Sequence, residues 1–254
     1  MGRSSDRRQQ SSRKQENRAS QRKERRAESH DNTRPHLASI HPKTSGQSEF
    51  QRVLRSNDLV FGLGPAGTGK TFLAVYEAVY ALENGLVDRI ILTRPAVEAG
   101  ERLGFLPGDL SEKIAPYLHP LIHSLHKMLP KGRVDCHLKN GKIEVVPLAY
   151  MRGRTLDDAY IILDEAQNCT FDQLLMLLTR IGEGSRCVLT GDASQTDLLE
   201  QSSGLITMYR VLEKVAGVGA YEMAVEDVVR HTLVADIIRA VDAYRNGKLI
   251  RQVV

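Results

Sequence analysis

The sequence lacks any long hydrophobic run. It holds no stretch of about 18 consecutive apolar residues, the length that a membrane-spanning helix requires. Its amino-terminal residues also contain no apolar core of the kind found in a secretory signal peptide. We therefore expect a cytoplasmic protein without a membrane segment.

Cysteine is also scarce. The chain has 3 cysteines, Cys136, Cys169 and Cys187, an odd number without Cys-x-x-Cys spacing. Such a set argues against a disulfide framework and against a thiolate zinc site. We interpret all three residues as buried free thiols.

The first 36 residues contain almost no apolar residues, and positive charge exceeds negative charge there. This segment contains 11 Lys and Arg against 5 Asp and Glu, whereas the rest of the chain contains 24 against 26. Its few apolar side chains cannot bury enough surface to offset the entropy of ordering. We predict a disordered basic tail over residues 1–42, which favours RNA or DNA through counterion release. A solubilising arm without a dedicated partner is the alternative.

From about Ser45 onward, short β-branched runs alternate with helical stretches, the pattern of an α/β domain with a mostly parallel sheet flanked by helices. Each strand candidate is nearly all apolar, as expected where helices cover both faces. The strand candidates are Leu59–Leu63, Arg89–Thr93, Ile143–Pro147, Tyr160–Leu163, Arg186–Thr190 and Gly219–Ala224. The helix candidates are Lys70–Glu83, Ser111–Leu129, Phe171–Ile181 and Thr232–Arg245. We predict one folded domain over residues 43–254.

The segment GPAGTGKT lies between the first strand candidate and the first helix candidate, and it matches the phosphate-binding pattern G-x-x-x-x-G-K-[ST]. Its glycines let backbone N–H groups converge on phosphate oxygens, and the start of a helix favours the anion. In such a loop Lys70 reaches the β- and γ-phosphates, and the hydroxyl of Thr71 binds Mg²⁺. The nucleotide-binding candidates are Gly64, Pro65, Ala66, Gly67, Thr68, Gly69, Lys70 and Thr71. A glycine-rich turn without a ligand is the alternative.

Two further apolar strands end in polar residues. AYIILDEAQN places Asp164 and Glu165 at the carboxyl end of one strand, where open α/β sheets bind their ligands. There Asp164 would hold Mg²⁺ and Glu165 would polarise the attacking water, whereas on an ordinary loop both would simply be solvated. CVLTGDASQTDL places Gln195 after the other strand, where its amide would sense the γ-phosphate or position water. The guanine-reading Asn-Lys-x-Asp pattern is absent, so we expect ATP rather than GTP.

Several segments together carry a more specific resemblance. They are GPAGTGKTFLA, TRPAVEAGERLGFLPGDLSEKIAPYL, YMRGRTLDDAYIILDEAQN, LTGDASQTDL and DVVRHTLV. With them, the sequence from about Lys43 to Tyr244 resembles the PhoH-like family of P-loop ATPases, which are related to the superfamily 1 helicase core. The resemblance implies a single RecA-like P-loop NTPase domain that hydrolyses ATP with Mg²⁺. It also implies a role in RNA metabolism, sometimes beside an endoribonuclease partner.

The resemblance assigns roles to two residues near the nucleotide. KTSGQSEF is similar to the family's glutamine motif, which makes Gln47 the expected reader of adenine. Arg230 in VRHTLV is similar to the late arginine that approaches the γ-phosphate. The sequence departs from the family pattern at Thr232, where proline is commoner, and in having no PIN nuclease domain. We therefore expect no nuclease activity in this chain.

The resemblance also implies a nucleic-acid surface and an oligomer. By analogy with helicases, the segment that faces nucleic acid contains Arg94, Glu98, Arg102 and Gly104. Arg152 and Arg154 are expected to do likewise or to lie at a subunit contact. Helicases of this superfamily clamp ATP between two cores, and this chain has room for one. We therefore expect an arginine finger from a neighbouring subunit and a homo-oligomer, with a hexameric ring implied by the family.

Some interpretations stay open. His119, His123 and His126 share a helical face, which could ligate zinc, but we favour a solvated or RNA-facing surface because spacing fixes no carboxylate or thiolate nearby. An ATP-switched module that recruits RNA or a nuclease with little turnover is an alternative to an RNA-coupled ATPase. A small-molecule kinase is another, although no acceptor motif is evident.

Overall fold

The computed structural model of the chain describes residues 40–95, 110–192 and 203–229, together with Ile237, Ala240 and Tyr244. Most of the predicted basic tail and of the predicted helix Thr232–Arg245 lies outside the described residues. The described residues all belong to the unit Leu37–Val254.

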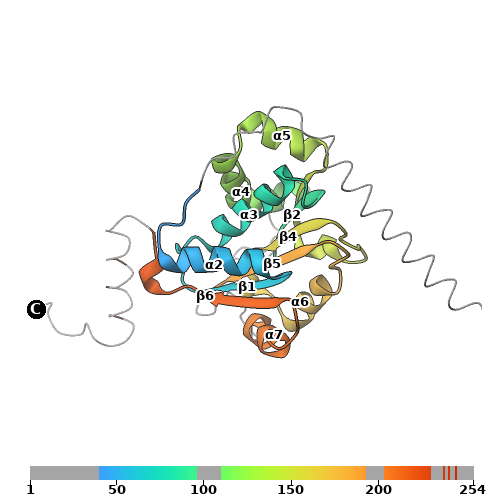
Figure 1. Ribbon diagram of the computed structural model, residues 1–254. Helices are drawn as coiled ribbons and strands as arrows, with labels where there is room; N and C mark the ends of the chain where they lie inside the picture. The colour runs from blue at the N-terminus through green and yellow to red at the C-terminus, as the bar shows by residue number, and fades with distance from the viewer. Residues whose placement is uncertain are drawn as a thin grey trace, which may run out of the picture. The chain divides into compact units, whose positions relative to one another are not determined.

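The described part of the chain forms a six-stranded sheet in which every neighbouring pair of strands is parallel (Figure 1). The strands are β1 (Leu59–Leu63), β2 (Arg89–Arg94), β3 (Ile143–Pro147), β4 (Ala159–Leu163), β5 (Arg186–Gly191) and β6 (Val218–Glu222). Their order across the sheet is β3-β2-β4-β5-β1-β6. Because all strands run the same way, their carboxyl ends meet at one edge. Strand β5 separates β1, which precedes the glycine-rich loop, from β4, which precedes the acidic pair.

Burial on both faces of the sheet explains the apolar strand sequences. Every residue of β4 is buried, and β1, β2 and β5 each leave only terminal residues partly exposed. A strand covered on both sides reads as a continuous apolar run rather than as an alternation of apolar and polar residues. The predicted strands therefore agree with the observed strands to within two residues at each end, and the predicted α/β fold is confirmed.

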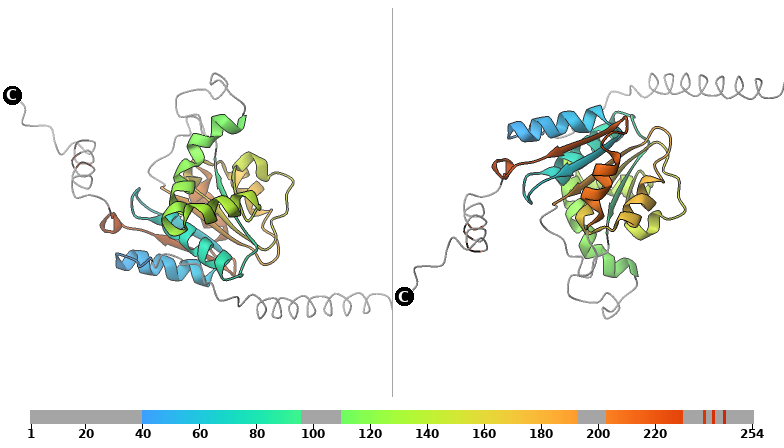
Figure 2. Two further views of the ribbon diagram at one scale, coloured as in Figure 1. Left: turned by 90° about the horizontal axis from the view of Figure 1, so that it is seen from above. Right: turned by 90° about the horizontal axis from the view of Figure 1, so that it is seen from below.

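Helices cover the two faces of the sheet, onto which the two views of Figure 2 look. The helices are α2 (Ser45–Ser56), α3 (Lys70–Glu83), α4 (Leu110–Met128), α5 (Lys131–Lys139), α6 (Phe171–Leu178) and α7 (Gly204–Leu212). The first four pack over one apolar core that includes Phe50 and Leu92, and the last two over a second core that includes Leu163 and Met208. Short 3₁₀ turns lie at Leu148–Met151 (η2), Ala166–Asn168 (η3) and Val225–Asp227 (η4). Among the described helices, none combines the length and the apolar character that a bilayer-spanning segment needs.

The sequence predicted some helices and missed others. Helix α3 has the predicted bounds, α4 ends one residue earlier and α6 ends at Leu178 rather than at Ile181. The helices α2, α5 and α7, with 12, 9 and 9 residues, were not predicted. Helices this short are marginal in isolation, so packing decides whether they form. In α2 that packing buries Phe50 and Leu54, while the side chain of Thr44 caps the first turn.

Two of the three cysteines are buried and one is exposed. Cys169 and Cys187 are buried, and burial raises the pKa of each thiol to about 12. The prediction of a buried thiol is wrong for Cys136, which is exposed. The reason is that α5 buries Val134 and His137 and turns the side that carries Cys136 toward solvent.

Candidate active site

A glycine-rich loop joins the carboxyl end of β1 to the first turn of α3. Its glycines have φ values of +120° at Gly64, +89° at Gly67 and +90° at Gly69, which L side chains rarely adopt. Space is also restricted, since a Cβ atom at Gly64 would lie 2.3 Å from the carbonyl oxygen of Met223. The loop therefore requires glycine, and it delivers the chain to a helix start, where an anion is favoured.

The ammonium group of Lys70 lies inside the curve of this loop. Lys70 is the first residue of α3 and is buried. Its Nζ donates hydrogen bonds to the carbonyl oxygens of Gly64 (2.6 Å) and Pro65 (2.8 Å). The Thr68 hydroxyl donates to the same Pro65 oxygen at 3.0 Å, so this hydrogen bond joins two residues of the loop. A cation in this position can meet the β- and γ-phosphates of a nucleotide.

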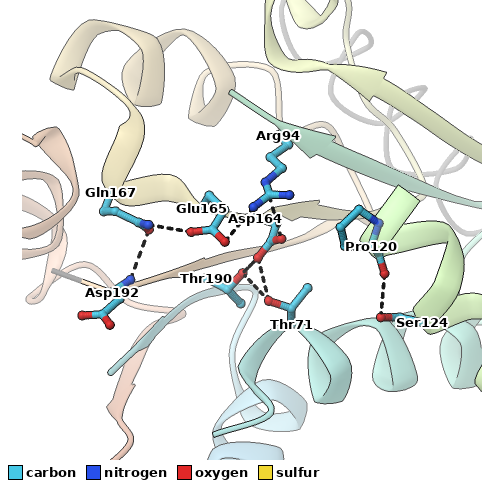
Figure 3. Close-up of polar contacts among 9 residues, drawn as sticks. All are labelled: Thr71, Arg94, Pro120, Ser124, Asp164, Glu165, Gln167, Thr190 and Asp192. Atoms are coloured by element: carbon cyan, nitrogen blue, oxygen red, sulfur yellow. Dashed lines mark hydrogen bonds and ion pairs between the residues drawn. The ribbon is translucent and has the colours of Figure 1, made fainter. Parts of the chain in front are cut away.

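Three oxygen atoms from three different elements meet beside the loop (Figure 3). The hydroxyl of Thr71 on α3 donates to Oδ1 of Asp164 at 2.6 Å, and the hydroxyl of Thr190 on β5 donates to the same oxygen at 2.9 Å. The two hydroxyl oxygens are 3.3 Å apart. Hydroxyl and carboxylate oxygens are the ligands that Mg²⁺ prefers, so this set fits a magnesium ion. The structure thus brings together both predicted metal ligands, Thr71 and Asp164, and adds Thr190.

The carboxylate of Glu165 is held from two sides. Its Oε1 accepts a hydrogen bond from the Arg94 guanidinium at 2.7 Å, and its Oε2 accepts one from the Gln167 amide at 2.6 Å. The Glu165 backbone has φ +56° and ψ +40°, a left-handed conformation that is uncommon for a residue other than glycine. Such strain persists only where the surroundings hold it, and it clusters at functional sites. The carboxylate is therefore placed next to the oxygen cluster by specific contacts.

The guanidinium of Arg94 lies close to both carboxylates of the acidic pair, Asp164 and Glu165. Besides the contact with Glu165, its Nε lies 3.9 Å from Oδ2 of Asp164. Its side chain is 22% exposed. The sequence assigned Arg94 to a nucleic-acid surface through resemblance, and nothing in the sequence pattern predicted this ion pair. A contact with nucleic acid stays a prediction for this residue.

Gln167 links Glu165 to the end of β5, and it is not among the site residues that the sequence predicted. Its Oε1 accepts a hydrogen bond from the backbone N–H of Asp192 at 3.1 Å. The approach is close, because a Cβ atom at Gly191 would lie 2.8 Å from that same Oε1. The available signal was its place two residues after Glu165 in DEAQ. Gln195, three residues beyond Asp192, lies outside the described residues.

Gln47 lies against the glycine-rich loop from the side of α2. Its Nε2 donates to the carbonyl oxygen of Thr68 at 2.9 Å, and its Oε1 accepts from the backbone N–H of Lys43 at 2.7 Å. Only 6% of Gln47 is exposed. The structure therefore places the predicted adenine reader beside the loop, where its amide already fastens α2 to that loop.

Asp227 joins the start of α2 to η4, and it is not among the site residues that the sequence predicted. The Thr44 hydroxyl donates to Oδ1 of Asp227 at 2.6 Å, and the backbone N–H of Ala224 donates to Oδ2 at 3.0 Å. A Cβ atom at Gly46 would lie 2.1 Å from Oδ2, so a larger residue there would displace the Asp227 carboxylate. A lone aspartate in the string VEDVV gives no local signal of such a contact.

The segment after η4 reaches the loop directly. The backbone N–H of Val229 donates to the carbonyl oxygen of Gly67 at 3.1 Å. Arg230 follows immediately in the chain but lies outside the described residues, as do Glu98, Arg102 and Gly104. The predictions for these residues therefore stay predictions.

The remaining candidates are Arg152, Arg154 and the three histidines. Arg154 donates to the Glu144 carboxylate of β3 at 2.7 Å, and Arg152 is exposed after η2. His119, His123 and His126 are all exposed on α4. Among the side chains that the structure describes, no group of three His, Cys, Asp or Glu is arranged to hold a metal ion. The structure thus adds no ligand to the zinc interpretation of the histidines.

Comparison with known proteins is consistent with this geometry. The family model described as PhoH-like protein matches residues 39–242. A PhoH-like protein of Bacillus subtilis (strain 168) is 58% identical over 205 residues, which cover 80% of this chain and 64% of the relative. Protein PhoH of Escherichia coli (strain K12) is 42% identical over 194 residues, or 75% of this chain and 55% of the relative. The chain therefore spans less than two thirds of the length of these relatives.

A solved structure shares the fold. The large terminase from the thermophilic bacteriophage D6E superposes with a TM-score of 0.50 at 11% sequence identity, covering 78% of this chain and 50% of that one. At this identity the likeness concerns the fold alone. The fold is that of a P-loop NTPase, with the glycine-rich loop at the carboxyl edge of a parallel sheet.

Proposed function

The chain belongs to the PhoH-like protein family, and from that premise we propose that it binds ATP with Mg²⁺ and hydrolyses it in a reaction coupled to RNA. One observation carries the proposal. The hydroxyls of Thr71 and Thr190 converge on the Asp164 carboxylate, directly beside Glu165. A lysine-bearing loop, a set of hard oxygens and a neighbouring carboxylate at one sheet edge are the groups that phosphoryl transfer needs.

Each group has a role in the transfer of the γ-phosphoryl group to water. Lys70 and the loop amides hold the phosphates, and Glu165 takes a proton from the attacking water. The water oxygen bonds to the γ-phosphorus as the bond to the β,γ-bridging oxygen breaks, so that ADP and phosphate leave. Mg²⁺, held by Thr71 and Asp164, would neutralise charge on the phosphate oxygens. ATP is proposed over GTP because the Asn-Lys-x-Asp pattern is absent.

Coupling to RNA and assembly are further parts of the proposal. The basic surplus of residues 1–36, 11 Lys and Arg against 5 Asp and Glu, supports polyanion binding. The family resemblance supports RNA metabolism, a possible role beside an endoribonuclease, and a hexameric ring. In such a ring, Arg230 or Arg154 would act as an arginine finger in the neighbouring site. A finger of this kind raises the rate of hydrolysis by about 10³–10⁵. Removal of residues 1–42 should weaken RNA affinity and make its salt dependence shallower.

The test of ATP binding and turnover is Lys70→Ala. Calorimetry with Mg-ATP and steady-state turnover, each with and without single-stranded RNA, should show loss of both binding and turnover in this variant. The matched control is Lys142→Ala, since Lys142 is exposed in the turn before β3. Parental turnover in Lys70→Ala would contradict the proposal. A mass measurement in solution tests the ring.

A second candidate is an ATP-controlled binding module with little turnover. The observation that favours it is the Glu165 carboxylate, both of whose oxygens already accept hydrogen bonds. Glu165→Gln separates the two candidates. A module keeps partner binding and cellular function in this variant, whereas an ATPase loses function while retaining bound ATP.

A further inference from the structure

Arg94 and Glu165 form a close cation–carboxylate contact in the described active site. Arg94 is the last residue of β2, whose neighbour Thr93 pairs with Leu163 on β4. The two parallel strands therefore deliver Arg94 and the acidic pair side by side, and Figure 3 shows the guanidinium reaching toward that pair. The distance is 2.7 Å to Glu165 and 3.9 Å to Asp164. Arg94 is thus tied to the proposed base more closely than to the proposed metal ligand.

The carboxylate of the proposed base is held in a fixed orientation, because each of its oxygens accepts one hydrogen bond from a side chain. Proton transfer from water needs a carboxylate oxygen within hydrogen-bonding reach of that water. One oxygen of Glu165 is engaged by Arg94 and the other by Gln167. Gln167 is in turn fixed by the backbone of Asp192. Release of the Arg94 contact would remove the charged partner from one oxygen of Glu165 while the Gln167 contact stays in place.

The Arg94 contact is also open to competition. The side chains of Arg94 and Glu165 are 22% and 37% exposed, so solvent and a charged ligand can reach the pair. Ion pairs at this level of exposure are partly screened and modest in strength. A guanidinium binds a phosphate with the same two-pronged geometry that it uses for a carboxylate.

Building on the proposed function, we propose that Arg94 is a positioning residue that holds Glu165 in a resting position and exchanges it for a backbone phosphate of single-stranded RNA. The exchange frees one oxygen of Glu165 for the attacking water. RNA then stimulates ATP hydrolysis by releasing the base, and the same guanidinium provides a phosphate-binding position at the carboxyl end of β2. No covalent bond forms or breaks in this step.

The first test compares turnover with and without RNA. In Arg94→Gln, turnover without RNA should rise by about fivefold, the size of one modest ion pair, and stimulation by a single-stranded homopolymeric RNA should fall toward one. Arg94→Lys should lie between this variant and the parent, because a lysine keeps the charge without the two-pronged geometry. The matched control is Arg89→Gln, since Arg89 lies at the other end of β2, is 30% exposed and also faces a glutamate. It should leave both rates unchanged.

The second test reads RNA affinity and does not depend on hydrolysis. If Glu165 competes with RNA for Arg94, Glu165→Gln should tighten binding of a fluorescent RNA oligonucleotide by about fivefold. The double variant Arg94→Gln, Glu165→Gln should lose that gain. Circular dichroism checks that each variant is folded.

Two results would overturn the exchange. One is unchanged or lower turnover without RNA in Arg94→Gln while stimulation by RNA persists. The other is parental RNA affinity in Glu165→Gln. Either result leaves the proposed ATPase intact if Lys70→Ala abolishes turnover. Absence of turnover in the parental protein contradicts the proposed function itself, and the RNA-affinity test still decides whether Arg94 and Glu165 compete.

Discussion

Thr71 and Asp164 share a hydrogen bond of 2.6 Å although 93 positions separate them in the chain. The bond joins the first turn of α3 to the carboxyl end of β4. It crosses above β5, whose Thr190 donates to the same carboxylate oxygen. The site is thus assembled at one edge of the sheet from elements that are not neighbours in sequence.

The shared carboxylate leads to a prediction about metal dependence. Asp164→Asn should lower ATP turnover by about 100-fold or more and raise the Mg²⁺ concentration for half-maximal rate, because an amide is a poorer ligand for a hard cation. Turnover measured across a magnesium series checks this. Asp172→Asn, on the exposed first turn of α6, is the control and should match the parent. An unchanged magnesium requirement in Asp164→Asn would remove Asp164 from the metal site.

Gly64 in the glycine-rich loop leads to a prediction about how one added carbon atom changes the free energy of unfolding. Gly64→Ala places a Cβ 2.3 Å from a backbone oxygen at φ +120°, so it should destabilise the protein by about 3 kcal/mol and weaken ATP binding. Gly132→Ala meets nothing within 4 Å and is the matched control. It lies in α5, where alanine is neutral or stabilises by up to about 1 kcal/mol. Urea unfolding measures both, and equal stability of the two variants would contradict the prediction.

Asp227 predicts a link between stability and nucleotide affinity. Thr44 and Ala224 each donate a hydrogen bond to one oxygen of Asp227, and Asp227→Asn replaces one of these two acceptors with an amide nitrogen. We therefore expect a loss of about 1–3 kcal/mol in the free energy of unfolding. The KM for ATP should rise more than kcat falls, because α2 carries Gln47 to the loop. Glu226→Gln, at an exposed neighbouring position, is the control. A variant that loses stability but keeps the parental KM would limit Asp227 to a structural role.

Glu83, the last residue of α3, contacts Arg133 and His137 of α5, and this clamp predicts a dependence of stability on pH. Burial tends to raise the pKa of Glu83, but hydrogen bonds from Arg133 and His137 outweigh burial and lower that pKa below its ordinary 4.5. A carboxyl whose folded pKa is lowered stabilises fully above its unfolded pKa and loses that contribution as pH falls through the folded value. The parental protein should therefore lose stability below about pH 4.5 more steeply than Glu83→Gln.

Urea unfolding between about pH 3 and about pH 7 tests the clamp. Glu83→Gln should be less stable than the parent by about 1–3 kcal/mol at neutral pH, because charge-assisted hydrogen bonds are lost. Glu213→Gln, an exposed substitution, should follow the parental curve. Parallel curves for the parent and Glu83→Gln would show that this carboxylate is not the group responsible.

The sequence by itself determined what depends on neighbours in the chain. Apolar runs bounded by polar residues predicted the strands to within two residues, and β1, β3 and α3 have the predicted bounds. The glycine spacing located the glycine-rich loop because positive φ values are a local requirement. The acidic pair was found for a similar reason, since polar residues directly after a buried strand must lie at the edge of the sheet.

Only the tertiary structure decided which distant side chains meet. The insertion of β5 between β1 and β4 brings Thr190 to Asp164, and the pairing of β2 with β4 brings Arg94 to Glu165. The helices α2, α5 and α7 are short, so their stability comes from burial against the sheet rather than from local propensity. Strand order and packing set these contacts, and both depend on free energies of burial and hydrogen bonding that act across space, not along the chain.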